Sequence, residues 1–175
     1  MEKIRIQVPA TSANCGPGYD TLGVACTLYN ELSFELLPPS EGLVLEASGE
    51  GKEYLVASEN NLVFKSFFSV WRAAQLSEVG LKISMQNNIP MSRGLGSSSS
   101  AIVAGVYAAN VLGENRFSQD ELLNFATAIE GHPDNVAPAL LGGFTISYME
   151  GSNAHSLSFK PVLPLKLIAA VPEHK

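Results

Sequence analysis

Residues 94–100, Gly-Leu-Gly-Ser-Ser-Ser-Ser, combine two glycines with four hydroxyl groups in a pattern that suits phosphate binding. Glycine lets the backbone approach a ligand closely, and serine supplies hydrogen-bonding hydroxyls. A helix that follows such a loop directs its unpaired backbone N–H groups at an anion. The stretch therefore predicts a phosphate cradle, although a serine-rich linker or a plain helix N-cap would contain the same residue types.

The flanking residues favour the cradle over the linker. Upstream, Leu81, Ile83 and Met85 alternate with polar residues, which is the period of a half-buried strand. Downstream, residues 101–112 are apolar on nearly every side, and Gly113 follows as a C-terminal stop. A linker rarely runs from such a strand directly into a buried helix, whereas a phosphate cradle needs both neighbours.

Two familiar phosphate loops do not fit this stretch. A Walker loop ends in Gly-Lys-Ser/Thr, and no lysine occurs between Lys82 and Lys160. The dinucleotide fingerprint needs a third glycine where this chain has Ser99. The cradle is therefore expected to belong to another class of nucleotide-binding protein.

A loop expected at residues 9–20 is a second candidate wall of the site. Its two glycines and Pro17 exclude regular structure, while Thr11, Ser12, Asn14 and Asp20 supply polar groups. Asparagine and aspartate are also common turn formers, so the residues alone leave a surface turn equally open.

The segment 130–135, Glu-Gly-His-Pro-Asp-Asn, is the third candidate. Taken alone, Glu130 would be a solvated helix end, and His132 would be a structural hydrogen bonder, as isolated histidines usually are. Asp134 is expected to cap a short helix within residues 132–141.

Together these three stretches resemble the GHMP kinases, the family named for galactokinase, homoserine kinase, mevalonate kinase and phosphomevalonate kinase. The phosphate loop of that family is similar to Pro-x-x-x-Gly-Leu-Gly-Ser-Ser, which residues 90–98 match. Residues 8–25, VPATSANCGPGYDTLGVA, and 130–143, EGHPDNVAPALLGG, are similar to the homoserine kinase branch in particular. Cys15 and Tyr19 depart from the leucine and phenylalanine common in that branch, which leaves the resemblance intact.

The resemblance implies ATP, Mg²⁺ and L-homoserine as ligands. The ATP contacts that it implies are Pro90, Arg93, Gly94, Leu95, Gly96, Ser97, Ser98, Ser99 and Ser100. It assigns the magnesium ion to Ser98 and Glu130. The amino acid would be held by Asn14, Asp20, His132 and Asp134. Asp20 and Asp134 suit its ammonium group, whereas His132 and Asn14 can hydrogen-bond its hydroxyl or carboxylate, and no catalytic base is assigned.

The implied fold is α+β, a mixed, mostly antiparallel sheet with helices on one side, of the kind called ribosomal-protein-domain-2-like. The residue patterns agree with this class. They predict strands in residues 4–8, 22–37, 43–47, 144–148 and 165–171. They also predict a helix after Asn60 with Trp71 in the core, and a helix that opens with a capping box at residues 118–121.

The resemblance extends from about Val8 to Lys175, and the last residues are similar to a point in the middle of homoserine kinases. Residues 1–175 are therefore expected to form the amino-terminal ATP-binding domain, without the carboxy-terminal GHMP domain. The implied activity is ATP-dependent phosphorylation of the L-homoserine hydroxyl to O-phospho-L-homoserine in threonine biosynthesis. Two alternatives remain: a catalytically idle nucleotide-binding fragment, or a GHMP kinase for another small alcohol such as mevalonate or a sugar.

Composition limits the partners. A formal net charge of -6 with scattered Lys and Arg argues against a nucleic-acid or anionic membrane surface. No apolar run reaches membrane-spanning length. Cys15 and Cys26 are too few for a disulfide framework, so a cytoplasmic protein is expected. The oligomeric state is left open, a homodimer included.

Overall fold

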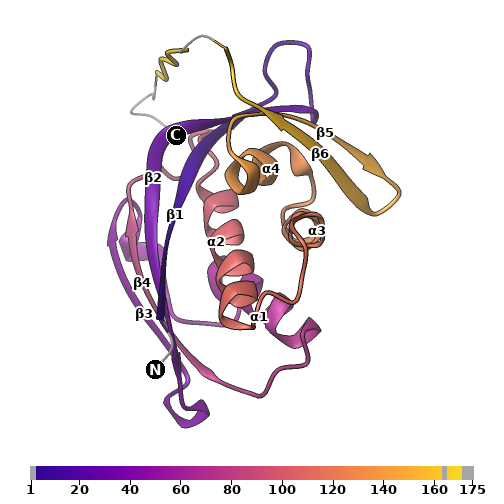
Figure 1. Cartoon of the computed structure of the whole chain (residues 1–175). Helices are drawn as coiled ribbons and strands as arrows, with labels where there is room; N and C mark the ends of the chain where they lie inside the picture. The colour runs from indigo at the N-terminus through magenta and orange to yellow at the C-terminus, as the bar shows by residue number, and fades with distance from the viewer. Residues whose placement is uncertain (1–2, 163–164, 171–175) are drawn as a thin grey trace.

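The computed structural model describes residues 3–162 and 165–170, in which a six-stranded sheet lies on one side of four α-helices (Figure 1). The strands are β1 (Lys3–Ala13), β2 (Leu22–Leu37), β3 (Leu43–Gly49), β4 (Gly80–Asn87), β5 (Phe144–Glu150) and β6 (Asn153–Phe159). The helices are α1 (Leu62–Ala73), α2 (Ser97–Leu112), α3 (Gln119–Glu130) and α4 (Pro133–Leu141). Two short 3₁₀ helices, Pro39–Glu41 and Lys52–Tyr54, complete the described elements.

The long strand β2 organises the sheet. β1 pairs with it antiparallel along one edge, from Lys3 opposite Glu35 to Ala13 opposite Gly23. The other edge of β2 pairs antiparallel with β4 over residues 31–37 and with β5 over residues 22–24. β3 and β4 form the parallel pair, with α1 between them in the chain. The predicted α+β class, with a mixed and mostly antiparallel sheet, is confirmed.

The inner face of the sheet and the helices share one apolar core. Its strand members include Ile6, Val8, Leu32, Phe34, Leu81 and Ile83, which alternate with polar residues in the sequence. Phe67 of α1 stacks between Phe34 and Trp71, with ring centroids 6.0 Å and 5.3 Å apart. Trp71 also donates its indole N–H to Ser77 O at 2.9 Å, so its expected place in the core is confirmed.

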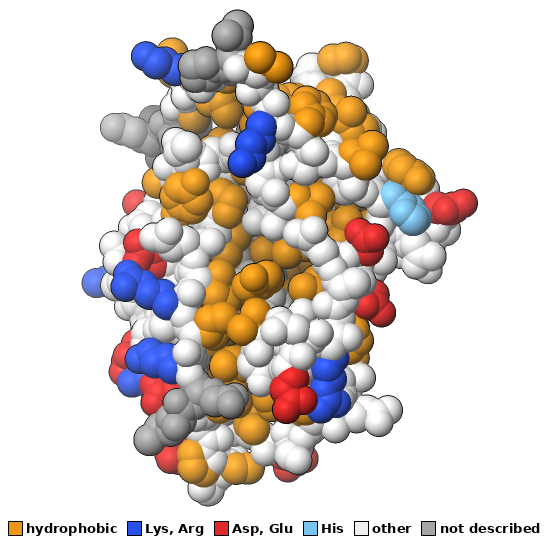
Figure 2. Space-filling model, viewed as in Figure 1, with side chains coloured by type: hydrophobic (Ala, Val, Ile, Leu, Met, Phe, Trp, Pro, Cys, Tyr) orange, Lys and Arg blue, Asp and Glu red, His pale blue; other side chains and the backbone are white. Residues whose placement is uncertain are grey.

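The central helix α2 is apolar around most of its surface, as the sequence predicted. Gly105 permits close packing against α1, because a Cβ atom there would lie 2.5 Å from Val63 O. The opposite side of α2 is less well covered, and Tyr107 is 43% exposed there. An open groove of about 550 Å³ runs between β1 and the helices at this point. Figure 2 shows apolar side chains gathered along the middle of this face.

Several element boundaries differ from the sequence prediction. The N-cap of α1 is Asn61 and not Asn60, since the Asn61 side chain accepts a hydrogen bond from Val63 N at 3.2 Å. The N-cap of α4 is His132 and not Asp134. Pro133 takes the first helical position, because its φ is preset for a helix and its missing N–H is not needed there, so Asp134 occupies the second.

The strand predicted at residues 165–171 is wrong for residues 165–170, which are irregular, while residue 171 lies outside the described part of the chain. A strand needs a paired neighbour, and no described strand pairs with this segment. By contrast, β6 was not predicted, although His155, Leu157 and Phe159 alternate with smaller residues.

Candidate active site

The loop between β4 and α2 adopts a conformation that requires glycine. Gly94 and Gly96 both have φ of 68°, in the left-handed region that favours glycine. A Cβ atom on Gly96 would also lie 2.0 Å from Thr11 Oγ1, whereas one on Gly94 would meet nothing within 4 Å. Gly96 is the N-cap of α2, and no described side chain caps the helix there. The first-turn N–H groups and the positive end of the helix dipole are therefore directed at the space in front of the loop.

This space is a cavity of about 520 Å³. The predicted phosphate-loop residues that line it are Arg93, Gly94, Leu95, Gly96, Ser97, Ser98 and Ser99. Pro90 and Ser100 are not among its lining residues. Pro90 follows β4 at the start of the loop, and the buried Ser100 hydroxyl accepts a hydrogen bond from Asn30 Nδ2 at 2.8 Å.

The cavity is also lined by residues that the motifs did not indicate. They come from the 3₁₀ helix before α1, the start of α1, β4 and the loop after it: Tyr54, Leu55, Asn61, Leu62, Val63, Met85, Asn87 and Met91. Most of these side chains are apolar, a lining that suits a flat, weakly polar group. Nothing in their spacing indicated a common site, because only the tertiary fold brings them together.

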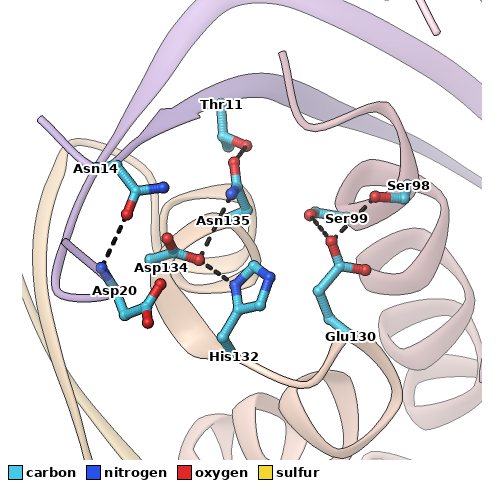
Figure 3. Close-up of polar contacts among 9 residues, drawn as sticks. All are labelled: Thr11, Asn14, Asp20, Ser98, Ser99, Glu130, His132, Asp134 and Asn135. Carbon is cyan, nitrogen blue, oxygen red and sulfur yellow. Dashed lines mark hydrogen bonds and ion pairs between the residues drawn. The ribbon is translucent and has the colours of Figure 1, made fainter. Parts of the chain in front are cut away.

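Glu130 lies beside the phosphate loop although it ends a different helix. Its Oε1 atom accepts hydrogen bonds from Ser98 Oγ at 3.0 Å and from Ser99 Oγ at 2.8 Å (Figure 3). In the described chain, every lysine and arginine ion pair involves a carboxylate other than Glu130. A carboxylate with no cationic side-chain partner, beside a serine hydroxyl and an anion site, is a donor set of hard oxygens that fits Mg²⁺.

His132 and Asp134 form a second polar group, of which His132 lines the cavity and Asp134 lies buried behind it. His132 Nδ1 hydrogen-bonds with Asp134 Oδ1. Asp134 is fully buried at the start of α4, and its Oδ2 atom has no hydrogen-bond partner among the described residues. A buried carboxylate oxygen without a partner is costly, so this atom is well suited to receive a cationic or N–H group of a ligand.

The two predicted residues of the first loop lie on the same side of the site as Asp134 (Figure 3). Asn14 and Asp20 have φ of 57° and 53°, and Asn14 Oδ1 accepts the backbone N–H of Asp20 at 2.9 Å. Both residues are exposed, and neither lines the cavity around the phosphate loop. The Asn14 oxygen is therefore engaged in shaping this loop, whereas the Asp20 carboxylate is open to solvent.

Asn30 is a buried polar residue that sequence reasoning missed. Its side chain accepts hydrogen bonds from the backbone N–H groups of Asn88 and Ile89, at 2.8 Å and 3.0 Å, and donates one to Ser100. One amide thus joins both ends of the phosphate loop. A signal was present, because Asn30 precedes Leu32 and Phe34 at the inward-facing spacing of β2, where an apolar residue is the rule.

A glycine- and serine-rich loop at the N-terminus of a buried helix, on this α+β sheet, is typical of a class of nucleotide-dependent kinase. The family described as "GHMP kinases N terminal domain" matches residues 61–143 of the chain. This match includes the loop, Glu130 and the segment after it. Residues 61–143 therefore have the sequence of a GHMP kinase amino-terminal domain.

The similar proteins narrow this class. A homoserine kinase of Natranaerobius thermophilus is 42% identical over 162 residues, which cover 91% of this chain and 51% of that protein. A crystal structure of homoserine kinase from Cytophaga hutchinsonii aligns with a TM-score of 0.75 and 32% identity, over 90% of this chain and 52% of that one. A mevalonate kinase of Methanococcus jannaschii, 14% identical with a TM-score of 0.70, shares the fold.

The chain spans about half the length of the curated relatives it matches. In the described part of the chain, no helix is both long enough and apolar enough to cross a membrane.

Proposed function

We propose that the protein phosphorylates the hydroxyl group of L-homoserine with ATP, and that residues 1–175 are the amino-terminal, ATP-binding domain of that kinase. The observation that carries this proposal is a cavity lined by the glycine loop, Glu130 and His132. Glu130 accepts hydrogen bonds from two serines of that loop, and the buried Asp134 carboxylate lies behind His132, to which it is hydrogen-bonded. The relatives that are 42% identical, over nearly the whole of this chain, are homoserine kinases.

The phosphate chain of ATP would lie along residues 93–99. Backbone N–H groups there and the dipole of α2 offset its negative charge, and Arg93 on the cavity wall adds a cation. Phosphoryl transfer demands mainly positioning and charge neutralisation, which a rigid loop of this kind supplies.

Ser98 and Glu130 would hold a magnesium ion at the same end of the cavity. When bound, the ion would help to neutralise the negative charge that develops on the phosphate oxygens during transfer. Glu130 Oε1 accepts hydrogen bonds from the Ser98 and Ser99 hydroxyls, so the carboxylate oxygen and the two hydroxyl oxygens already lie close together.

The amino acid would lie with its ammonium group at Asp134. Asp134 Oδ2 is buried and unpartnered among the described residues, and the nearby Asp20 adds a second negative charge on that side. His132, which lines the cavity, remains in reach of the substrate hydroxyl or carboxylate through its Nε2 atom, because Nδ1 is engaged by Asp134.

The same carboxylates argue against the other small alcohols of the family. Mevalonate is an anion and would be repelled by a buried carboxylate, while a neutral sugar would leave the Asp134 charge uncompensated. An alcohol that carries an ammonium group would compensate the negative charge of Asp134. The second candidate function, a nucleotide-binding domain without turnover of its own, is favoured by the length of the relatives, since this chain spans about half of them.

The test is ATP- and L-homoserine-dependent formation of O-phosphohomoserine by the product of the complete open reading frame that contains this chain. Mevalonate and galactose serve as competing alcohols under the same conditions. Turnover of homoserine, at least about tenfold above the other alcohols in kcat/KM, is expected. Preference for another alcohol would refute the proposed substrate.

The 175-residue chain is assayed beside that product, with ATP binding measured separately from turnover. We expect the 175-residue chain to bind Mg·ATP and to be a very poor kinase. Arg93 is the only lysine or arginine among the residues lining the cavity, so it would have to pair with the homoserine carboxylate as well as with the phosphates. Equal rates for the two polypeptides would refute the division of function between domains.

A further inference from the structure

Thr11 is buried between the phosphate loop and the Asp134 segment, and the proposed function has so far given it no role. Its backbone N–H donates to Leu95 O at 3.0 Å, and its hydroxyl donates to Asn135 Oδ1 at 2.8 Å (Figure 3). The side chain is completely inaccessible to solvent. Thr11 therefore contacts both halves of the site through two different groups.

An irregularity of the sheet places Thr11 there. The register between β1 and β2 shifts at this point, from Pro9 opposite Tyr29 to Thr11 opposite Ala25. Such irregularities redirect side chains and often lie next to active sites. Ala10 and Thr11 are both buried, so the alternation of inward and outward residues is interrupted.

Asn135 is the side chain that the Thr11 hydroxyl can orient. Asn135 lines the cavity, and its Nδ2 atom lies 3.5 Å from Asp134 Oδ1, at the long limit of a hydrogen bond. The two ends of an amide have nearly the same shape, so packing alone selects its orientation poorly. A hydroxyl that donates to Oδ1 selects the orientation in which the NH₂ group, and not the oxygen, lies beside the Asp134 carboxylate.

We propose that Thr11 is a positioning residue of the amino-acid site, which fixes the Asn135 amide beside Asp134 and holds it in register with the phosphate loop. This inference rests on the proposed function, since it assigns Asp134 to the substrate ammonium. A flipped amide would present its oxygen to the Asp134 carboxylate, and the resulting repulsion would displace the group that receives the substrate.

Thr11→Val tests the proposal, because it removes the hydroxyl and keeps the shape. The backbone N–H of residue 11 still reaches Leu95 O, so the phosphate loop is expected to stay in place. Thr11→Ser restores the hydroxyl without the methyl group. Thr127→Val is the matched control, since the Thr127 hydroxyl is equally buried and has no partner among the described residues.

In the product of the complete reading frame, we expect Thr11→Val to lower kcat/KM for L-homoserine about tenfold or more, with the KM for ATP changed less than about threefold. Thr11→Ser should recover most of the loss, and Thr127→Val should resemble the wild type. Equal losses for ATP and homoserine, or failure of Thr11→Ser to recover activity, would show a merely structural role. An unchanged Thr11→Val enzyme would overturn the proposal directly.

A measurement without turnover separates this inference from the proposed function. The side-chain amide signals of Asn135, assigned with Asn135→Asp, are compared by NMR in the wild type and Thr11→Val. We expect them to shift in Thr11→Val and to remain in place in Thr127→Val. A shift in a protein that does not phosphorylate homoserine would uphold the orienting contact and refute the proposed substrate. Unmoved signals in an active enzyme would refute the role of Thr11 alone.

Discussion

Ser98 Oγ lies 3.0 Å from Glu130 Oε1, although the two residues are 32 positions apart and belong to different helices. The contact connects the start of α2 to the end of α3 at the mouth of the phosphate loop. We infer that this pair, with the phosphates of ATP, provides the oxygen ligands of the magnesium ion.

Glu130→Gln is expected to lower the affinity of the enzyme for magnesium without disturbing the phosphate loop. Glutamine keeps the oxygen that accepts from the two serines and loses the negative charge that a divalent cation needs. The magnesium concentration for half-maximal turnover should rise about tenfold or more. Glu114→Gln, which alters an exposed carboxylate paired with Arg116, is the control and should leave that concentration unchanged. An unaltered magnesium requirement in Glu130→Gln would exclude Glu130 as a ligand.

The two glycines of the phosphate loop should respond differently to alanine. Gly94→Ala meets no neighbour within 4 Å, so it should cost only the strain of a positive φ, about 1–2 kcal/mol of unfolding free energy. Gly96→Ala adds a clash with Thr11 Oγ1 at 2.0 Å and should move the loop, with loss of ATP affinity as well as stability. Urea unfolding and nucleotide titration of both variants check this. The assignment of the loop fails if a folded Gly96→Ala protein binds ATP normally.

Asp134→Asn is expected to act on homoserine and to spare the nucleotide. Asparagine can keep the acceptor for His132 while it removes the charge proposed to bind the ammonium group. Turnover of L-homoserine should fall more than about tenfold, or about 1.4 kcal/mol of transition-state binding, with ATP affinity nearly constant. Steady-state kinetics of Asp134→Asn provide the measurement. Asp120→Asn, which removes an exposed carboxylate of α3, is the control. Unchanged kinetics with homoserine would mean that this segment does not hold the substrate.

The capping box of α3 should make the free energy of unfolding depend on pH in the acid range. The Ser118 backbone N–H and then its hydroxyl donate to the Glu121 carboxylate, and they lower the pKa of Glu121 from its ordinary value of 4.5. Because the folded pKa is the lower one, the unfolded chain binds more protons, and the stabilisation is present above the unfolded pKa. It is lost as pH falls through the folded pKa.

The direction of this pH dependence is checked with Glu121→Gln, which keeps an acceptor for the capping box and removes only the charge. The difference in unfolding free energy between wild type and variant should be largest near neutral pH and should shrink as the solution is acidified below 4.5. Glu78→Gln, at an exposed site outside the helices, provides the comparison. A difference that grows in acid would contradict the assigned direction of the pKa.

The sequence alone determined the features that depend on neighbouring residues. Alternation identified β2 and β4, the capping box identified the start of α3, and the order of three motifs identified the family. These signals are local, because backbone periodicity and helix caps involve residues within a few positions of each other. Local signals failed where a proline shifted the start of α4 to His132 and where residues 165–170 had no strand to pair with.

Only the tertiary structure decided which polar groups meet. Thr11 and Asn135 are 124 positions apart, and Ser99 and Glu130 are 31 apart, so no spacing in the sequence links them. They meet because β1, α2, α3 and α4 pack together around the shared apolar core. The unpartnered oxygen of Asp134 likewise follows from burial at the end of that core, which a sequence does not display. Residue types predicted the chemistry of the site, but its geometry depends on long-range packing, which brings distant segments together only in the folded chain.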